Sequence, residues 1–105
     1  MIALASTALI CPATAQGQVS FRNETVSVYV GYGPGGGYDA YARHVARHMG
    51  KHLPGAPQIV PRNMPGGGGR VAAAHMANVA PKAGPFLCTA DHSLPLQQAM
   101  GAPSI

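Results

Sequence analysis

The chain has 105 residues, enough for one small domain, and only 10% of them are charged while 47% are apolar. The net charge of +4 favours anionic partners, but the seven Lys and Arg residues form no dense basic run. Aromatic residues make up 6% of the chain and do not alternate with basic ones, so we expect no base-stacking surface and no nucleic-acid partner.

The first fifteen residues differ in kind from the rest. Residues 2–10 form an almost unbroken apolar run, and Ala13-Thr14-Ala15 offers small residues at a cleavage position before Gln16. The run is too short to span a bilayer as a helix. We therefore expect a secretory signal peptide over residues 1–15, with a short buried helix as the alternative.

An alternating run of apolar and polar residues predicts the first strand over residues 25–30. A glycine-rich stretch follows over residues 31–37. Apolar side chains then recur every three or four residues, which predicts a helix over residues 39–53, ended by Pro54 and Gly55. A strand that leads through glycines into a helix presents backbone N–H groups at the positive end of the helix dipole. This loop is therefore a candidate site for a phosphate or a carboxylate.

The order of strand, polar loop and helix occurs three times along the chain. Such alternation predicts an α/β fold, βαβαβα, with a parallel three-stranded sheet. Because the carboxyl ends of parallel strands lie at one edge of the sheet, we expect the three loops to converge there. The further elements are expected at residues 58–60 (strand, ended by Pro61), 70–80 (helix), 86–90 (strand) and 94–100 (helix).

The first loop also matches the G-x-G-x-x-G pattern of dinucleotide-binding folds, at residues 31–36. Those folds place an acidic residue at the end of the second strand to bind the ribose hydroxyls, whereas this chain has Arg62 and Asn63 there. A dinucleotide also leaves the second glycine loop, residues 63–69, unexplained. We therefore favour a carboxylate as the anion, with an NAD(P)-binding Rossmann-type enzyme domain as the alternative.

Three motifs in order carry a family resemblance. Residues 34–43 fill the pattern P-G-G-x-x-D-x-x-A-R without a gap. Residues 63–68 are similar to N-x-P-G-A-G, with Gly67 in place of Ala, and residues 80–84 are similar to A-P-x-D-G, with Ala83 in place of Asp. Over essentially all of the chain after the predicted signal peptide, the sequence thus resembles the solute receptors of tripartite tricarboxylate transporters.

The resemblance implies a periplasmic, two-lobed receptor that closes on a small di- or tricarboxylate and delivers it to membrane permease subunits. The fold it implies is a periplasmic-binding-protein lobe, of which residues 16–105 would form an incomplete N-terminal part. Binding would be impaired by truncation, and an inactive remnant of a truncated gene is a further alternative. The resemblance implies no cofactor, and it assigns to ligand binding Tyr32, Gly35, Gly36, Asp39, Gly67, Gly68, His92 and Ser93.

Other polar residues suggest competing roles. His44, His48 and His52 recur every four residues along the first predicted helix, a spacing that suits Zn²⁺. Basic residues alternate with them, so we predict a solvated basic face and no metal site. Asp39 lies in the first turn of that helix, where a carboxylate can cap the helix, contact the ligand, or do both. The three acidic residues of the chain do not pair by spacing, so we expect no catalytic site and no enzyme.

Overall fold

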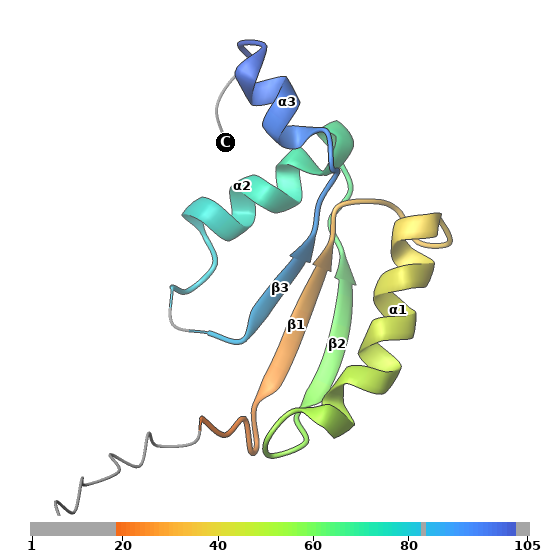
Figure 1. The fold of residues 1–105 in the computed structure, drawn as a ribbon, viewed down its shortest axis with the longest axis vertical. Helices are drawn as coiled ribbons and strands as arrows, with labels where there is room; N and C mark the ends of the chain where they lie inside the picture. The colour runs from red at the N-terminus through yellow and green to blue at the C-terminus, as the bar shows by residue number, and fades with distance from the viewer. Residues whose placement is uncertain (1–18, 83, 103–105) are drawn as a thin grey trace, which may run out of the picture.

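The computed structural model describes residues 19–82 and 84–102, which form a three-stranded sheet with helices between the strands (Figure 1). β1 (Thr25–Val30) lies in the centre, with β2 (Gln58–Asn63) and β3 (Phe86–Thr89) on either side. Both strand pairs are parallel, so the predicted α/β fold with a parallel sheet is confirmed. The predicted signal peptide, residues 1–15, lies outside the described residues.

The helices of the described chain are α1 (Gly37–Met49), α2 (Arg70–Asn78) and α3 (Leu94–Ala99). α1 continues into a 3-10 turn, Gly50–His52, and a second 3-10 turn, Gly67–Gly69, precedes α2. Figure 1 shows α1 and α2 on opposite sides of the sheet. The strand order explains this, because right-handed connections that leave β1 and β2 in opposite directions place their helices on opposite faces. Within this part of the chain, no helix is long and apolar enough to cross a membrane.

β2 is longer than the sequence predicted. It continues through Pro61, the residue expected to end it, and stops at Asn63. Pro61 is tolerated because β2 is an edge strand, where an absent N–H group need not interrupt the pairing with β1. α1 also begins at Gly37, before the predicted start at Asp39. The extension of β2 brings Asn63 level with Val30, at the edge where the loops leave the sheet.

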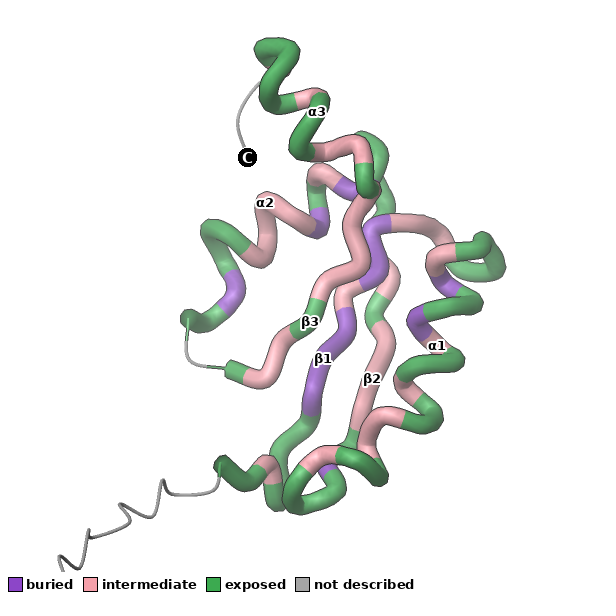
Figure 2. Tube along the Cα trace, in the orientation of Figure 1, coloured by how far each residue is buried: buried purple, intermediate pink, exposed green. Residues whose placement is uncertain are grey.

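The core is small and centred on β1 (Figure 2). Val28 and Val30 pack with Ala42 of α1, and Tyr38 and Ile59 cover this cluster from α1 and β2. Valine and alanine are small, so this cluster buries little apolar area per residue. The position of the loops therefore depends heavily on contacts at the ends of the strands.

The opposite face of the sheet packs against α2. The ring of Tyr29 lies with its centroid 4.9 Å from that of His75 and 6.2 Å from that of Phe86. Cys88 is level with Tyr29 on β3 and is partly buried, and this burial raises the pKa of its thiol above the ordinary value. His75 thus contributes to packing through its contact with the ring of Tyr29. Cys88 also contributes to packing, and its raised pKa makes it a poor nucleophile.

The three loops at the carboxyl edge of the sheet touch one another. A Cβ atom at Gly31 would lie 2.7 Å from the Cα of Gly69 and 3.1 Å from the carbonyl oxygen of Thr89. A Cβ atom at Gly69, whose φ is +87°, would lie 3.2 Å from the backbone nitrogen of Asp91. The backbones meet with no room for side chains at these glycines, so the predicted convergence of the loops is confirmed.

Replacing Gly31 by Ala should lower the free energy of unfolding by about 1–3 kcal/mol, because the new methyl group would overlap the backbone of Gly69. Gly33→Ala is the matched control, since no atom lies within 4 Å of the position that its Cβ would take. Urea unfolding followed by circular dichroism measures both variants. Equal unfolding midpoints for the two would contradict the close packing of the loops.

Candidate functional site

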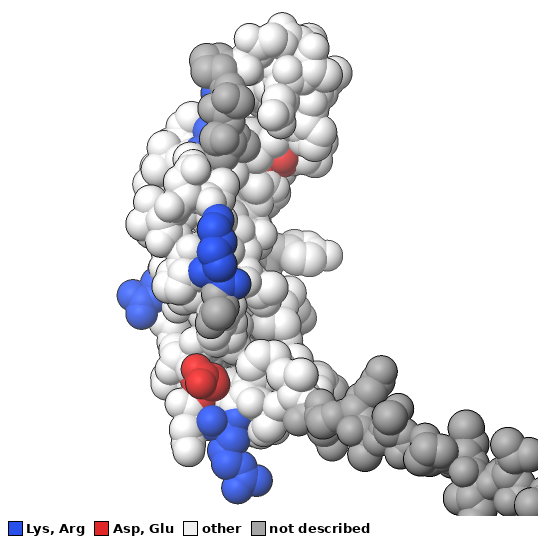
Figure 3. All heavy atoms as spheres, turned by 90° about the vertical axis from the view of Figure 1, so that its left-hand side faces the viewer, with Lys and Arg blue, Asp and Glu red and all other residues white. Residues whose placement is uncertain are grey.

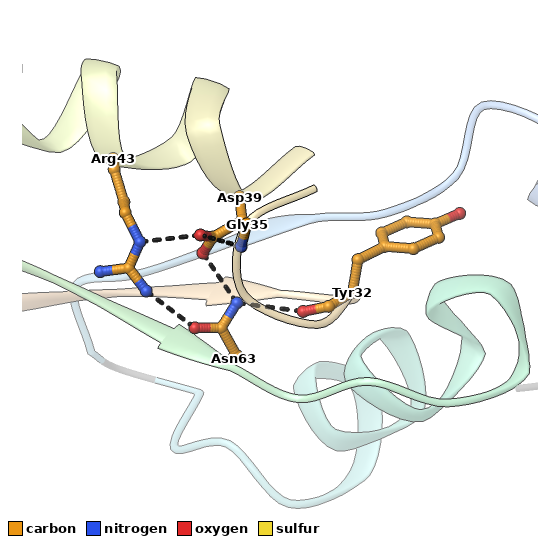
Figure 4. Close-up of polar contacts among 5 residues, drawn as sticks. All are labelled: Tyr32, Gly35, Asp39, Arg43 and Asn63. Carbon is orange, nitrogen blue, oxygen red and sulfur yellow. Dashed lines mark hydrogen bonds and ion pairs between the residues drawn. The ribbon is translucent and has the colours of Figure 1, made fainter. Parts of the chain in front are cut away.

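A hydrogen-bonded network joins the first glycine loop to the end of β2 (Figure 4). Oδ2 of Asp39 accepts hydrogen bonds from Nε of Arg43 and from the backbone N–H of Gly35, both at 2.9 Å. Asn63 donates from Nδ2 to Oδ1 of Asp39 at 2.8 Å and to the carbonyl oxygen of Tyr32 at 3.0 Å. Arg43 closes the network by donating to Oδ1 of Asn63 at 2.9 Å. These contacts fix the loop, the first turns of α1 and the end of β2 relative to one another.

Asp39 is a buried charge that the network holds. It is 3% exposed, and hydrogen bonds from Arg43, Gly35 and Asn63 hold its pKa well below the ordinary value of 3.8. The same ion pair raises the pKa of Arg43. The helix begins after Gly36, which no side chain caps, and Asp39 reaches back instead to the N–H group of Gly35. Asp39 thus binds the loop that precedes the helix and does not cap an N–H group of its first turn, and both of its carboxylate oxygens are engaged within the protein.

The glycine backbone beside this network is the part of the first two loops that can meet an anion. Gly36 has an extended backbone, with φ −78° and ψ 172°, and leads directly into the first turn of α1. N–H groups in the first turn of a helix have no partner within the helix, and the helix dipole is positive there. The N–H group of Gly35 is bound to Asp39, so an anion would meet the groups from Gly36 onward. In the second loop, Gly67 and Gly68 are exposed, with φ of +53° and +61°.

The third loop is bound to the first through two tyrosines. The hydroxyl of Tyr32 donates to Oδ2 of Asp91 at 2.5 Å, and its ring stacks on that of Tyr38 with the centroids 4.4 Å apart. The N–H group of Ser93 donates to Oδ1 of Asp91 at 2.6 Å, and Nδ1 of His92 lies 3.4 Å from the hydroxyl of Tyr38. The hydrogen bond to Asp91 raises the pKa of Tyr32 to about 12, while hydrogen bonds from Ser93 and Tyr32 lower the pKa of Asp91 to about 2.

Every residue that the resemblance assigned to the ligand lies at the carboxyl edge of the sheet, on a loop, in the 3-10 turn before α2 or, for Asp39, in the first turn of α1. Tyr32 is turned away from the Asp39 network and toward the third loop, as Figure 4 shows, so its side chain links these two loops. The second loop joins them through the backbone of Gly69. Sequence reasoning did not single out Asp91 as a contact, because its partner lies 59 positions away along the chain. Arg43 was visible only as a motif residue, although its spacing of four from Asp39 is typical of an ion pair on a helix.

The end of β2 is not arranged for a dinucleotide. Dinucleotide-binding folds place a carboxylate there for the ribose hydroxyls, and this position is Asn63. Its side-chain amide is fully used as a donor toward Asp39 and Tyr32. The NAD(P)-binding alternative is therefore not favoured.

The remaining charged side chains, and those of the kinds that can bind a metal, do not gather in one place on the described part of the chain. The rings of His44 and His48 lie 4.8 Å apart on the exposed side of α1, but no group of three or more His, Cys, Asp or Glu that could hold a metal occurs among the described residues. On the face drawn in Figure 3, Lys and Arg side chains lie in separate groups, with wide uncharged areas between them. Nucleic-acid-binding surfaces instead gather such side chains in one patch.

Comparison with known proteins agrees with the resemblance carried by the loop motifs. Over 80 residues, or 76% of the chain, the sequence is 40% identical to a UPF0065 protein in the TAR-I ttuE-ttuC' intergenic region of Agrobacterium vitis. The chain spans only 22% of the length of that curated relative. No protein-family model matches the chain, and no solved structure matches it significantly. The similarity supports a relationship to receptor-like proteins of tripartite tricarboxylate transporters.

Replacing Asp39 by Asn should lower the free energy of unfolding at neutral pH, because the amide NH₂ would face one of the donors that Asp39 now accepts from. The pKa of Asp39 is lower in the folded chain than its ordinary 3.8, so its charge contributes stability that is complete above that value and is lost as the pH falls through the folded pKa. The difference between wild type and variant should therefore stay constant from about pH 7 to 5 and shrink only below about pH 4.

Denaturant unfolding at several pH values measures this difference. Glu24→Gln is the control, because Glu24 is an exposed acid directly before β1 and its replacement should change the free energy of unfolding little. An Asp39→Asn difference that has vanished by pH 5, or an equal effect of Glu24→Gln, would contradict the assigned network.

Replacing Asp91 by Asn should bring the pKa of Tyr32 down from about 12 toward its ordinary value of 10.0, because the carboxylate that holds the phenol proton is removed. Alkaline titration followed by ultraviolet absorbance reports phenolate formation directly. Tyr32→Phe identifies the signal, since it should remove the late-titrating phenol from the wild-type curve. An unchanged curve in Asp91→Asn would show that the contact between the first and third loops does not form.

Proposed function

We propose that the chain supplies the carboxylate-binding loops of a periplasmic solute receptor for a tripartite tricarboxylate transporter. The observation that carries this proposal is the meeting of three loops at the carboxyl edge of the sheet, where α1 and α2 begin. Open α/β sheets bind ligands at such an edge, where successive connections leave in opposite directions. The similarity to the UPF0065 relative supports the same family.

The chemistry of this edge suits a carboxylate. Backbone N–H groups and the positive ends of helices stabilise a carboxylate directly or through water, without a side-chain cation. Arg43, the cation of α1 beside the first loop, is already paired with Asp39 and oriented toward Asn63. The ligand would therefore be recognised mainly by neutral donors.

In this proposal, backbone and side chains have different roles. Gly36, Gly67 and Gly68 would present N–H groups to the carboxylate, and His92 and Ser93 would offer donors from the third loop. Gly35 shapes the turn with its φ of +88°, and its N–H group is held by Asp39. Asp39 and Tyr32 thus act as positioning residues, since their polar atoms hold the loops in place.

The remaining parts of the proposed function concern the whole receptor. Residues 1–15 would direct export to the periplasm, and the loaded receptor would deliver its solute to the membrane permease subunits. The chain spans 22% of its relative, so closure over the ligand would need a second lobe from the rest of a receptor. A site open on one side does not exclude water, so the described residues alone should bind with low affinity.

The test is a titration of the isotope-labelled chain with succinate, malate and citrate, followed by nuclear magnetic resonance of the backbone amides. Glycine amides appear in their own region of the spectrum, so the loop signals are readily identified. We expect saturable shifts at Gly36, Gly67 and Gly68, with a Kd on the order of 1 mM.

Succinamide is the matched control, because it has the shape of succinate without its charges and should cause no such shifts. Inorganic phosphate and NADH at the same concentration test the competing anions. Shifts that are equal for succinamide, that lie outside the loops, or that are largest for NADH would each overturn the proposal.

A further inference from the structure

Two histidines on α1 form a close pair that the proposed function does not use. The ring centroids of His44 and His48 lie 4.8 Å apart, with an angle of 50° between the ring planes. Both residues are exposed, on the solvent side of α1. Residues four positions apart on an α-helix face the same direction, so the backbone of α1 holds these two rings next to one another.

The separation of the two rings is the one that a shared metal ion requires. A metal lies about 2.0–2.1 Å from an imidazole nitrogen, and therefore about 3.2 Å from the centre of the ring. Two rings on one metal then have centroids about 4.5 Å apart at a right angle and about 5.2 Å apart at the tetrahedral angle. The observed 4.8 Å falls between these values. Because both side chains are exposed, their torsion angles can adjust to direct one nitrogen of each toward a common point.

The structure separates this pair from the third histidine of the series. His52 follows His48 by four residues, but α1 ends at Met49 and His52 lies in the 3-10 turn Gly50–His52. A 3-10 turn has three residues per turn instead of 3.6, so His52 is displaced from the row of the other two histidines. The site therefore has two protein ligands, and water would complete the coordination of a bound metal.

The basic residues between the histidines, from which the sequence predicts no metal site, are directed elsewhere in the structure. Arg43 is bound to Asp39 and Asn63, so its charge is compensated by a carboxylate (Figure 4). Arg47 lines a cleft between α1 and Ile59 of β2. Both guanidinium groups are thus held on the β2 side of α1, away from the histidine pair.

We propose that His44 and His48 bind one divalent transition-metal ion on the outer face of α1. Neutral imidazole is a common ligand of Zn²⁺, Ni²⁺ and Cu²⁺. Among these ions, Cu²⁺ has the highest affinity for a given set of nitrogen and oxygen ligands, and its tetragonal geometry accepts two nitrogens together with water. Cu²⁺ is therefore the ion that binds most tightly. The site is separate from the loops at the carboxyl edge of the sheet and does not depend on the proposed function.

The experiment has to identify the responding histidines, because the chain has five of them and a free cysteine, Cys88. Calorimetric titration with CuCl₂ and with ZnCl₂ measures the affinity. Nuclear magnetic resonance of isotope-labelled imidazole rings during the Zn²⁺ titration identifies the ligands, because Zn²⁺ is diamagnetic. We expect saturable binding that is tighter for Cu²⁺ than for Zn²⁺, with the largest shifts at His44 and His48.

His44→Gln and His48→Gln should each weaken Cu²⁺ binding by about tenfold or more, because the second imidazole raises affinity only while both ligands lie side by side. His52→Gln is the matched control, and it should change the Kd by no more than about twofold because His52 lies outside α1. Val45→His added to His48→Gln restores the number of imidazoles but places them at adjacent positions, which do not face each other on a helix. This double variant should not recover the affinity.

Circular dichroism of each variant verifies that the fold is kept, as expected for exposed positions. The absence of saturable Cu²⁺ binding would overturn the proposal, as would a Kd that His44→Gln and His48→Gln leave unchanged. A loss in His52→Gln equal to theirs, or full recovery in the double variant with Val45→His, would also overturn it. Either result would show that the α-helical spacing of His44 and His48 does not form the site.

Discussion

The hydrogen-bonded network of Asp39, Arg43 and Asn63 is the constraint on which the arrangement of the loops depends. The apolar core is made of valines and alanines around β1, and so few buried methyl groups do not determine the position of loops beyond the strand ends. The network does this with directional bonds between 2.8 and 2.9 Å. It is satisfied internally, which matters because a buried carboxylate without its partners would destabilise the fold that it now orders.

This network gives a physical meaning to the motifs that suggested the family. Asp39 and Arg43 belong to the first motif and Asn63 opens the second, and the structure brings the two motifs together through their side chains. The motif side chains therefore bind each other, and the glycines between them shape the backbone. A pattern of this kind records how a site is held in place, and it records the ligand only indirectly.

Much of the fold was predictable from the sequence because it depends on local patterns. The alternation in β1 and the glycine loops predicted the parallel sheet and the meeting of its loops, and both are present. The passage of β2 through Pro61 was not predictable, because it depends on β2 lying at the edge of the sheet. The sequence also left two roles open for Asp39, because the choice between them depends on contacts with residues far away along the chain. Burial and the partner Asn63, 24 positions away, favour the positioning role, and neither is a local property of the chain.

The third loop is also held in place by a hydrogen-bonded carboxylate, Asp91, but the donors around it differ from those around Asp39. Asp91 holds its charge through the hydroxyl of Tyr32 and the N–H group of Ser93, both neutral donors, whereas Asp39 has a guanidinium beside it. The third loop thus keeps the negative charge of Asp91 near the edge that an anion would approach. Beside the first loop, by contrast, the ion pair of Asp39 and Arg43 has no net charge. An incoming carboxylate is therefore repelled on one side unless it lies closer to the helix ends of the first two loops. In the proposed function, the charge of Asp91 would therefore make Gly36 and Gly67 the stronger contacts of the carboxylate and His92 and Ser93 the weaker ones.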